Sequence, residues 1–280
     1  MKISIVGVGL IGGSLALSLK EAKFSSQIIG VDNNVDNLKK AMDLGIIDSS
    51  LKLEEAIANS DLIILAIPVN AIQGLLPSIL SQITKSQVVM EMGSTKEEIL
   101  ESINNHPNRG RLVALHPMAG TEYSGPEAAV PDLFNGKNMV FCDVTRTDDD
   151  AFDIAEAVCD TLKMNPVFMH AKEHDLHAAY VSHISHITSF ALALTVLEKE
   201  KSQGRIFELA GGGFASTVRL AKSSAEMWVP IFKQNKKNIL EVLEEHIRQL
   251  QRIHDVLDKE DYPTMLKLIK QSNKIKRIIK

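Results

Sequence analysis

The sequence predicts an α/β fold in which an N-terminal, doubly wound parallel sheet is followed by an all-helical C-terminal domain. Up to about residue 170, short apolar runs alternate with segments whose apolar residues recur at helical spacing. This alternation is typical of parallel strands joined by crossover helices. From residue 171 onward we find only helical spacing. A chain of 280 residues also exceeds the usual single domain, so we expect two domains, residues 1–170 and 171–280.

The N-terminal half contains a regular series of expected elements. The apolar run 61–69 is continuous, as in a parallel strand that helices cover on both faces. The expected strands are 2–6, 28–32, 61–69, 87–92, 111–115, 138–144 and 166–170, and the expected helices are 10–22, 34–44, 71–82 and segments beginning at Lys96 and near Asp148.

The C-terminal half is expected to consist of long helices. Residues 172–200 and 225–254 show helical spacing, the triple glycine 211–213 interrupts between them, and a last helix begins near Tyr262. Apolar residues such as Ile239, Leu243 and Ile247 line one face of the second segment. Such a stripe is commonly buried against a second subunit, so we expect a homodimer.

The first expected strand runs directly into a glycine motif, and the second ends in Asp32. Gly7 permits a tight strand-to-helix turn, Gly9 leaves room for a pyrophosphate, and Gly12 lets the helix pack closely on the strand. Asp32 can accept hydrogen bonds from the adenosine ribose hydroxyls and would repel a 2′-phosphate, which favours NAD over NADP. The order of strand, glycines, helix, strand and acid predicts a Rossmann domain. The residues expected to contact NAD are Gly7, Gly9, Leu10, Ile11, Gly12, Asp32 and Pro68.

The composition argues against several classes of protein. A formal net charge of −4 gives no reason to expect nucleic acid or an anionic membrane as a partner. Cys142 and Cys159 lack metal-ligand spacing and are expected to be thiols in a reducing compartment. No basic leader precedes the first strand, and no uninterrupted apolar run reaches the roughly 18 to 20 residues of a membrane helix. We expect a cytoplasmic enzyme with a small-molecule substrate.

Polar residues follow two expected strands at their carboxyl ends, where ligands of such sheets bind. Ser94 follows strand 87–92 and could cap its own helix, with Glu97 three residues further on, and a contact with a ligand is compatible with that role. His116 ends strand 111–115 before Pro117, so its ring is expected to point into the cleft near the nicotinamide. A histidine there suits a proton acceptor, because its pKa lies near the working pH.

A cluster of histidines lies in the helical half. The i, i+3 spacing of His183 and His186 places both on one face of a helix that also carries Ser182. Adding His174 and His177 would suggest zinc, but no cysteine or carboxylate completes a ligand set, so we expect no metal. His183 could simply pack between helices.

Two residues after the triple glycine are further candidates. Arg219 stands among small and apolar residues, where a bidentate pair with a substrate carboxylate explains it better than a surface salt bridge. Trp228 is the single tryptophan, and such a residue more often belongs to a core than to a ligand site.

Five motifs occur in the order seen in prephenate dehydrogenases, and the sequence resembles that family over nearly its whole length. They are GVGLIGGSLA, GSTK, HPMAGTE, VSHISH and the stretch GGGF…R…S…MW. The resemblance implies oxidative decarboxylation of prephenate to 4-hydroxyphenylpyruvate, the tyrosine precursor, with reduction of NAD. His116 would take the proton of the ring hydroxyl, with Ser94 hydrogen-bonded beside it.

The resemblance also implies a set of substrate contacts. Arg219 would bind a carboxylate, and His186 would line the substrate entrance. The remaining contacts would be Glu122, Ser182, Gly213 and Trp228. Many relatives carry a lysine–acid pair after GGGF where this chain has Ala215 and Ser216, which puts any gating that depends on those charges in doubt.

Three other functions fit parts of the sequence. Arogenate differs from prephenate only in an amino group in place of the side-chain keto group, so an arogenate dehydrogenase that forms tyrosine directly stays open. A β-hydroxyacid dehydrogenase shares the architecture, but those enzymes resemble one another in a lysine followed one turn later by an asparagine, where this helix has histidines and serine. A non-catalytic NAD-binding protein would be expected to lack His116, Ser94 and Arg219, which are present.

Overall fold

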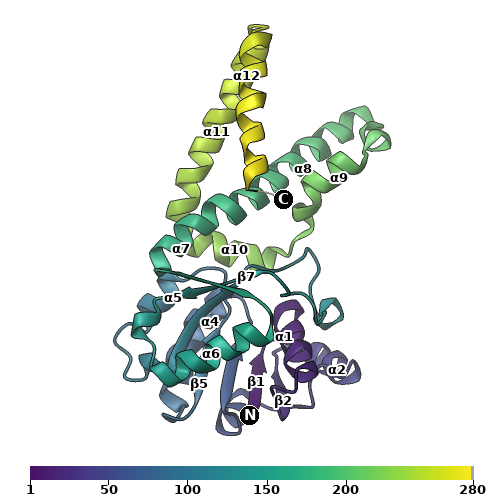
Figure 1. Cartoon of the computed structure of the whole chain (residues 1–280). Coiled ribbons are helices and arrows are strands. Elements are labelled where there is room, and N and C mark those ends of the chain that lie inside the picture. The colour runs from purple at the N-terminus through teal and green to yellow at the C-terminus, as the bar shows by residue number, and fades with distance from the viewer. Residues whose placement is uncertain (279–280) are drawn as a thin grey trace. The chain divides into compact units, whose positions relative to one another are not determined.

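The structure of the protein is a computed structural model that describes residues 1–278 (Figure 1). Within these residues the strands form one sheet in the order β3-β2-β1-β4-β5-β6-β7-β8. The strands are β1 (Lys2–Val6), β2 (Gln27–Val31), β3 (Ser49–Ser50), β4 (Leu62–Leu65), β5 (Val88–Glu91), β6 (Leu112–Pro117), β7 (Asn138–Cys142) and β8 (Asn165–Met169).

Helices connect these strands and make up the rest of the chain. In the first part of the chain they are α1 (Leu10–Glu21), α2 (Val35–Asp43), α3 (Leu53–Ala58), α4 (Val69–Gln82), α5 (Glu97–Ser102) and α6 (Asp149–Thr161). The later ones are α7 (Ala171–Ala178), α8 (Ile184–Gln203), α9 (Gly212–Val218), α10 (Ala225–Gln234), α11 (Lys236–Asp258) and α12 (Tyr262–Ser272). The sequence analysis missed β3 and α3, which are short.

The sheet is parallel from β3 to β6, and its order reverses between β1 and β4. This is the switch point at which an open α/β sheet leaves a crevice for a ligand. β7 is antiparallel to β6, and β8 is parallel to β7, which refines the expected parallel sheet. No crossover helix lies between β6 and β7 in the described chain, so β7 can return directly, and α6 then restores a parallel crossover to β8.

Two apolar cores cover the two faces of the sheet. Strand residues alternate between them: Ile5 of β1 belongs to the core with α1 and α6, whereas Val6 belongs to the core with α4 and α5. The second core also takes in Trp228 and Ile231 of α10. Helix α10 packs on α4, and α7 packs on α5 and β7, so both lie at the edge of the sheet where β1 ends (Figure 1).

The expected helix 172–200 is continuous but contains an irregular turn. A π-helical segment, Ala179–His183, joins α7 to α8. Single π-turns of this kind add one residue to the turn and occur often at functional sites. By length and composition alone, the stretch Ala171–Ser202 is also apolar enough to cross a membrane, although uninterrupted apolar runs in the sequence are too short to predict a span.

The expected helix 225–254 is in fact two helices, which corrects that prediction. Helix α10 begins after Ser224, whose side chain accepts a hydrogen bond from the Met227 N–H, and it ends at Asn235. The Asn235 side chain is buried and hydrogen-bonded to the carbonyl of Asp175 on α7. This contact between distant segments fixes the break, and helical spacing gives no sign of it.

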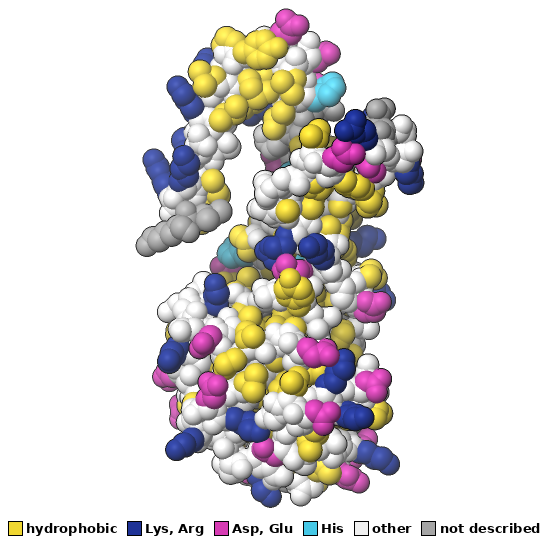
Figure 2. All heavy atoms as spheres, turned by 90° about the vertical axis from the view of Figure 1, so that its right-hand side faces the viewer, with side chains coloured by type: hydrophobic (Ala, Val, Ile, Leu, Met, Phe, Trp, Pro, Cys, Tyr) yellow, Lys and Arg dark blue, Asp and Glu magenta, His cyan; other side chains and the backbone are white. Residues whose placement is uncertain are grey.

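Chain contacts divide the molecule into two compact units, Met1–Asn235 and Lys236 onward. The second unit is the helical hairpin of α11 and α12, as the sequence predicts for a last helix near Tyr262. Apolar side chains remain exposed on both of its helices (Figure 2), among them Leu250, Leu257, Leu266 and Ile269.

Candidate functional site

The glycine turn between β1 and α1 has the geometry that a dinucleotide needs. Gly7 has φ of 93°, a left-handed conformation, and its N–H donates to the carbonyl of Val31 at 2.7 Å. A Cβ at Gly12 would collide with the carbonyl oxygen of Gly7, so only glycine lets α1 pass this close. Among residues 1–278, nothing lies within 4 Å of a Cβ built on Gly9. The space above Gly9 is therefore open to a pyrophosphate beside the first amides of α1.

Asp32 is joined to the same turn. Its Oδ2 accepts from the N–H of Val8 at 3.1 Å, and its Oδ1 accepts from the N–H of Asn34 at 2.8 Å. These bonds hold the carboxylate at the end of β2, and each oxygen keeps a lone pair for a ribose hydroxyl. Pro68 is the N-cap of α4 in the short turn that follows β4, so it borders the crevice at the switch point. The residues present fit bound NAD.

The loop between β6 and β7 is fastened to the helices of the nucleotide turn. Ser14 of α1 accepts a hydrogen bond from the N–H of Val130 at 3.0 Å, and Lys40 of α2 forms an ion pair with Glu127 at 2.7 Å. Glu122 belongs to the same loop. The chain that follows His116 is thereby held against α1 and α2.

His116 is the first member of a buried chain of three side chains. Its Nδ1 lies 2.7 Å from Nε2 of His174, whose Nδ1 lies 2.7 Å from Oδ1 of Asp175. A carboxylate can only accept, so His174 carries its proton on Nδ1, and its Nε2 accepts from Nδ1–H of His116. Nε2 of His116 then keeps its lone pair. The arrangement fixes the tautomer that a general base requires.

Asp175 also caps helix α5. Its Oδ1 accepts from the backbone N–H of Lys96 at 2.8 Å, and its Oδ2 accepts from that of Glu97 at 2.9 Å. Helix α5 begins at Glu97 with Lys96 as its N-cap, so the alternative that Ser94 caps this helix is wrong. The cap comes instead from α7, a segment far away in the sequence.

A fully buried ion pair supports the turn after β5. Nζ of Lys96 lies 2.5 Å from Oε1 of Glu91, and both side chains are 0% exposed. The other carboxylate oxygen accepts from the N–H of Gly93 at 2.9 Å. Burial raises the pKa of Glu91, and the ammonium of Lys96 opposes that shift. The pair fixes the segment that carries Ser94.

The electrostatics of the site keep His116 neutral. Burial lowers the pKa of His116 well below 6.5, and the nearby His174, Lys96 and His183 lower it further. Burial likewise lowers the pKa of His174, although Asp175 opposes the shift. His116 therefore has an open lone pair over the whole range of neutral pH.

Arg219 forms an ion pair with Glu122, so the salt bridge that the sequence analysis considered as the alternative is present. Nη1 of Arg219 lies 2.7 Å from Oε2 of Glu122, and the arginine side chain is 49% exposed. The pKa of Glu122 is lowered by its own backbone N–H and by the Arg219 guanidinium. The exposed part of the guanidinium has donors left for a carboxylate.

His186 and Trp228 form one stacked pair. Their ring centroids are 3.5 Å apart at an interplanar angle of 29°, and Phe232 packs against the indole. Nδ1 of His186 donates to the carbonyl of Ser182 at 3.2 Å, which leaves Nε2 as an acceptor. Burial lowers the pKa of His186, and the charge of Arg219 lowers it further.

The structure brings some predicted residues together and leaves others apart. His116, Arg219 with Glu122, and His186 with Trp228 have the contacts described above. Ser94 is half-buried, and within residues 1–278 the structure gives its hydroxyl no hydrogen bond to His116. Gly213 is exposed in the first turn of α9. In the described chain no group of three side chains has the arrangement of a metal site.

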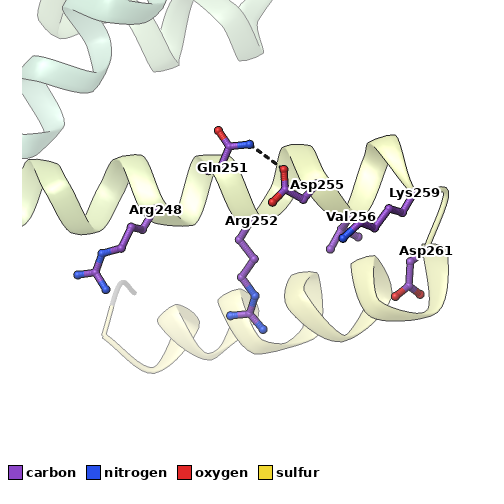
Figure 3. Close-up of a pocket in the computed structure, with 7 residues that line it drawn as sticks. All are labelled: Arg248, Gln251, Arg252, Asp255, Val256, Lys259 and Asp261. Carbon is purple, nitrogen blue, oxygen red and sulfur yellow. Dashed lines mark hydrogen bonds between the residues drawn. The ribbon is translucent and has the colours of Figure 1, made fainter.

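Two surface hollows lie elsewhere. A groove of about 470 Å³ between α11 and α12 is lined by charged and polar side chains such as Arg248, Arg252 and Asp255 (Figure 3). A second hollow, of about 250 Å³, lies beside Arg109 and Arg146. Neither contains a predicted site residue, so neither is the site of the chemistry.

Comparison with known proteins decides the family. Residues 15–167 match the sequence model described as prephenate dehydrogenase, nucleotide-binding domain, and residues 170–271 match prephenate dehydrogenase, dimerization domain. The chain belongs to the prephenate dehydrogenase family. The resemblance inferred from the five motifs is thereby confirmed.

Individual members of the family are similar along nearly the whole chain. The prephenate dehydrogenase of Bacillus subtilis is 30% identical over 96% of this chain and 73% of its own length. That of Lactococcus lactis is 31% identical over 99% of this chain and 77% of its own length. The crystal structure of the Aquifex aeolicus prephenate dehydrogenase, in complex with hydroxyphenyl propionate and NAD+, has a TM-score of 0.90 at 30% identity and covers 99% of this chain and 97% of its own.

The sequence analysis missed the residues that organise the site. It named His174 only as a possible zinc ligand and did not single out Asp175, Asn235 or Glu91. The adjacent His-Asp pair on an apolar helix is a signal that could have drawn attention to Asp175, because a buried acid needs partners. Asn235 gives no such signal, since its role depends on contacts with α7.

Proposed function

We propose that the protein is an NAD-dependent prephenate dehydrogenase, which converts prephenate to 4-hydroxyphenylpyruvate and CO2. The observation that carries the proposal is the buried chain His116–His174–Asp175 at the carboxyl end of β6, in a Rossmann domain whose glycine turn fits NAD. Membership of the prephenate dehydrogenase family supports it.

The chemistry follows from what prephenate needs. Bound NAD supplies the acceptor for the hydride that leaves C4 of the ring. Nε2 of His116 takes the proton of the C4 hydroxyl, so the C–O bond becomes a carbonyl. The bond from C1 to its carboxylate then breaks, CO2 leaves, and the electron pair enters the ring. The ring becomes aromatic as the oxygen takes the proton back from His116, so the proton balance closes.

The other predicted side chains bind and orient the substrate in this proposal. Arg219 takes a carboxylate, in exchange for part of its contact with Glu122. His186 and Trp228 form an aromatic wall, and Ser94, Ser182 and Gly213 complete the lining. These tasks are positioning and charge pairing, which suffice when cofactor and base supply the chemistry.

The same residues can act on arogenate, and this stays the second candidate. The two substrates differ only at the side chain, where prephenate has a keto group and arogenate an ammonium. An acidic residue near that position would favour arogenate, and Glu122 is already paired with Arg219. An assay with both substrates decides between the two candidates.

We also propose the domain organisation and assembly expected from the sequence. The division into residues 1–170 and 171–280 is supported by the two family models, which meet between residues 167 and 170. A homodimer formed by the helical part is supported by the description of the second model as a dimerization domain. A location in the cytoplasm is supported by the use of NAD and by the two free, buried thiols of Cys142 and Cys159, because thiols stay reduced in that compartment.

The decisive experiment measures NADH formation at 340 nm with prephenate and with arogenate, each with NAD and NADP. We expect turnover of prephenate with NAD and the appearance of 4-hydroxyphenylpyruvate in equal amount. NADH formation with arogenate alone would shift the assignment to the second candidate. Tight NAD binding without turnover of either compound would contradict the proposal.

A further inference from the structure

Two buried side-chain nitrogens, one on His183 and one on Trp228, lack a hydrogen-bond partner among the described residues. Nε2 of His183 and Nε1 of Trp228 are completely buried and make no hydrogen bond to any atom of the part of the chain that the structure describes. His183 is 1% exposed and Trp228 6%, and their rings meet edge to face with centroids 5.8 Å apart. Buried polar groups are almost always paired, so an unpaired donor indicates a ligand or a water that completes it.

The tautomer of His183 follows from its contact with Asn235. Nδ2 of Asn235 lies 2.6 Å from the carbonyl oxygen of Asp175, and only the amide NH2 can face a carbonyl. The same nitrogen lies 3.1 Å from Nδ1 of His183, so Nδ1 accepts and the proton is on Nε2. Burial lowers the pKa of His183 to about 4, so the ring is neutral. The unpaired atom is therefore an N–H donor.

His183 belongs to the reacting end of the site. Asp175 connects the two histidines, since its carboxylate orients His174 and its carbonyl holds Asn235. On its other side His183 meets the indole of Trp228, which stacks on the ring of His186. His183 also ends the π-helical turn, which is where an added residue redirects a side chain.

We propose that Nε2–H of His183 donates a hydrogen bond to the oxygen on the reacting ring carbon, the same oxygen whose proton His116 takes. This inference rests on the proposed function. The oxygen gains carbonyl character as the hydride leaves, and a neutral N–H donor whose ring is held by Asn235 would stabilise such an oxygen. The sequence analysis considered His183 as a possible zinc ligand, which it set aside, and as a packing residue.

The test compares two ligands that differ in one hydroxyl, 3-(4-hydroxyphenyl)propionate and 3-phenylpropionate, bound to the NAD-loaded enzyme in a calorimeter. His183→Phe keeps a ring against Trp228 but removes the donor, and His183→Gln restores an N–H near the position of Nε2. We expect the preference of the wild type for the hydroxylated ligand to fall at least fivefold in the Phe variant and to recover in the Gln variant. His177→Phe, an exposed position on the same helix, is the matched control.

Kinetics give a second measurement. Loss of an oxyanion donor typically lowers kcat by about 10²-fold, so we expect a loss of that order in the Phe variant with little change in KM. If the wild type is active and the Phe variant keeps the same preference for the hydroxylated ligand, this inference is overturned. A uniform weakening of both ligands would also overturn it, because it would indicate a contact with the carboxylate or a structural role. An inactive wild type would instead contradict the proposed function.

The wild type alone can also be tested, in case the variants do not fold. In ¹⁵N-labelled enzyme the His183 ring should be the Nε2–H tautomer, and its Nε2–H proton should shift on binding the hydroxylated ligand only. An equal shift with both ligands would show that a buried water, and not the ring oxygen, completes the donor, and would overturn the inference.

Discussion

His116 is the residue on which the proposed chemistry depends most. We expect His116→Asn to lower kcat by roughly 10²- to 10⁴-fold, the usual range for a positioned proton acceptor, with little change in KM or in the Kd of NAD. Steady-state kinetics and calorimetry measure these quantities. The exposed His254→Asn serves as the control. Near-normal kcat in His116→Asn would move the search for the base to His186.

The pH profile of kcat/KM tests the same residue in the free enzyme. A base must be neutral, so activity is present above its pKa and is lost as the pH falls through that pKa. Since burial lowers the pKa of His116 well below 6.5, the acid limb should lie below pH 6.5 and not in the range of a solvent-exposed histidine. A limb at pH 7 or above would contradict the buried arrangement with His174.

Replacing Arg219 should change a different kinetic constant from replacing His116. Arg219→Gln removes a charge-assisted pair with a carboxylate, so we expect KM to rise roughly 10- to 100-fold while kcat changes little. The neighbouring exposed cation Lys222 provides the matched control, Lys222→Gln. Equal losses in both variants would indicate a general effect of positive charge and not a specific anchor.

Single residues show how far sequence reasoning reaches. Gly7, Gly12 and Asp32 could be placed in advance, because the turn and its acid lie within one strand–helix–strand unit and obey local rules. The tautomer of His116 could not, because it depends on His174, 58 residues away in the sequence. Ser94 illustrates the same limit, since the cap that its sequence suggests is supplied by Asp175.

At the scale of elements, Asp175 joins α7 to α5 and orients the base through His174. We expect Asp175→Ala to lower kcat and also the midpoint temperature of unfolding, because three bonds to a buried charge are lost, each worth roughly 1 to 3 kcal/mol. Enzyme assays and thermal melts measure the two effects. Glu173→Ala, an exposed position on the same helix, should change neither. Lost stability with unchanged kcat would mean that Asp175 only caps α5.

The elements themselves divide into predictable and unpredictable ones. β1, β5 and α1 are recovered closely, because apolar runs and helical spacing report burial directly. Apolar runs and helical spacing do not predict the reversed direction of β7, because an antiparallel return needs only a loop. They do not predict the helix break at Asn235 either, because that break depends on a contact with α7. The π-helical turn is likewise set by packing and not by local preference.

For the whole molecule, the decisive question is whether two chains associate. The second unit keeps apolar side chains exposed along α11 and α12, with Leu250 and Leu257 each 53% exposed. Burying one such side chain contributes roughly 1.5 to 3 kcal/mol, so a face of several leucines and isoleucines can hold a dimer together. We therefore expect sedimentation at micromolar concentration to give twice the 30.8 kDa of one chain.

Substitutions on that face locate the interface. Leu250→Glu and Leu257→Glu place charges on the exposed apolar side of α11, so in combination they should shift the enzyme to a species of about 31 kDa, close to the 30.8 kDa of one chain. Glu241→Lys, at an exposed polar position of the same helix, should leave the dimer intact. NAD affinity should survive dissociation, because the glycine turn and Asp32 lie within one Rossmann domain. A wild type that sediments as a monomer would refute the proposed dimer. If the double variant is still a dimer, the interface must lie elsewhere, and α8 is the next candidate because Leu194 and Leu197 are also exposed.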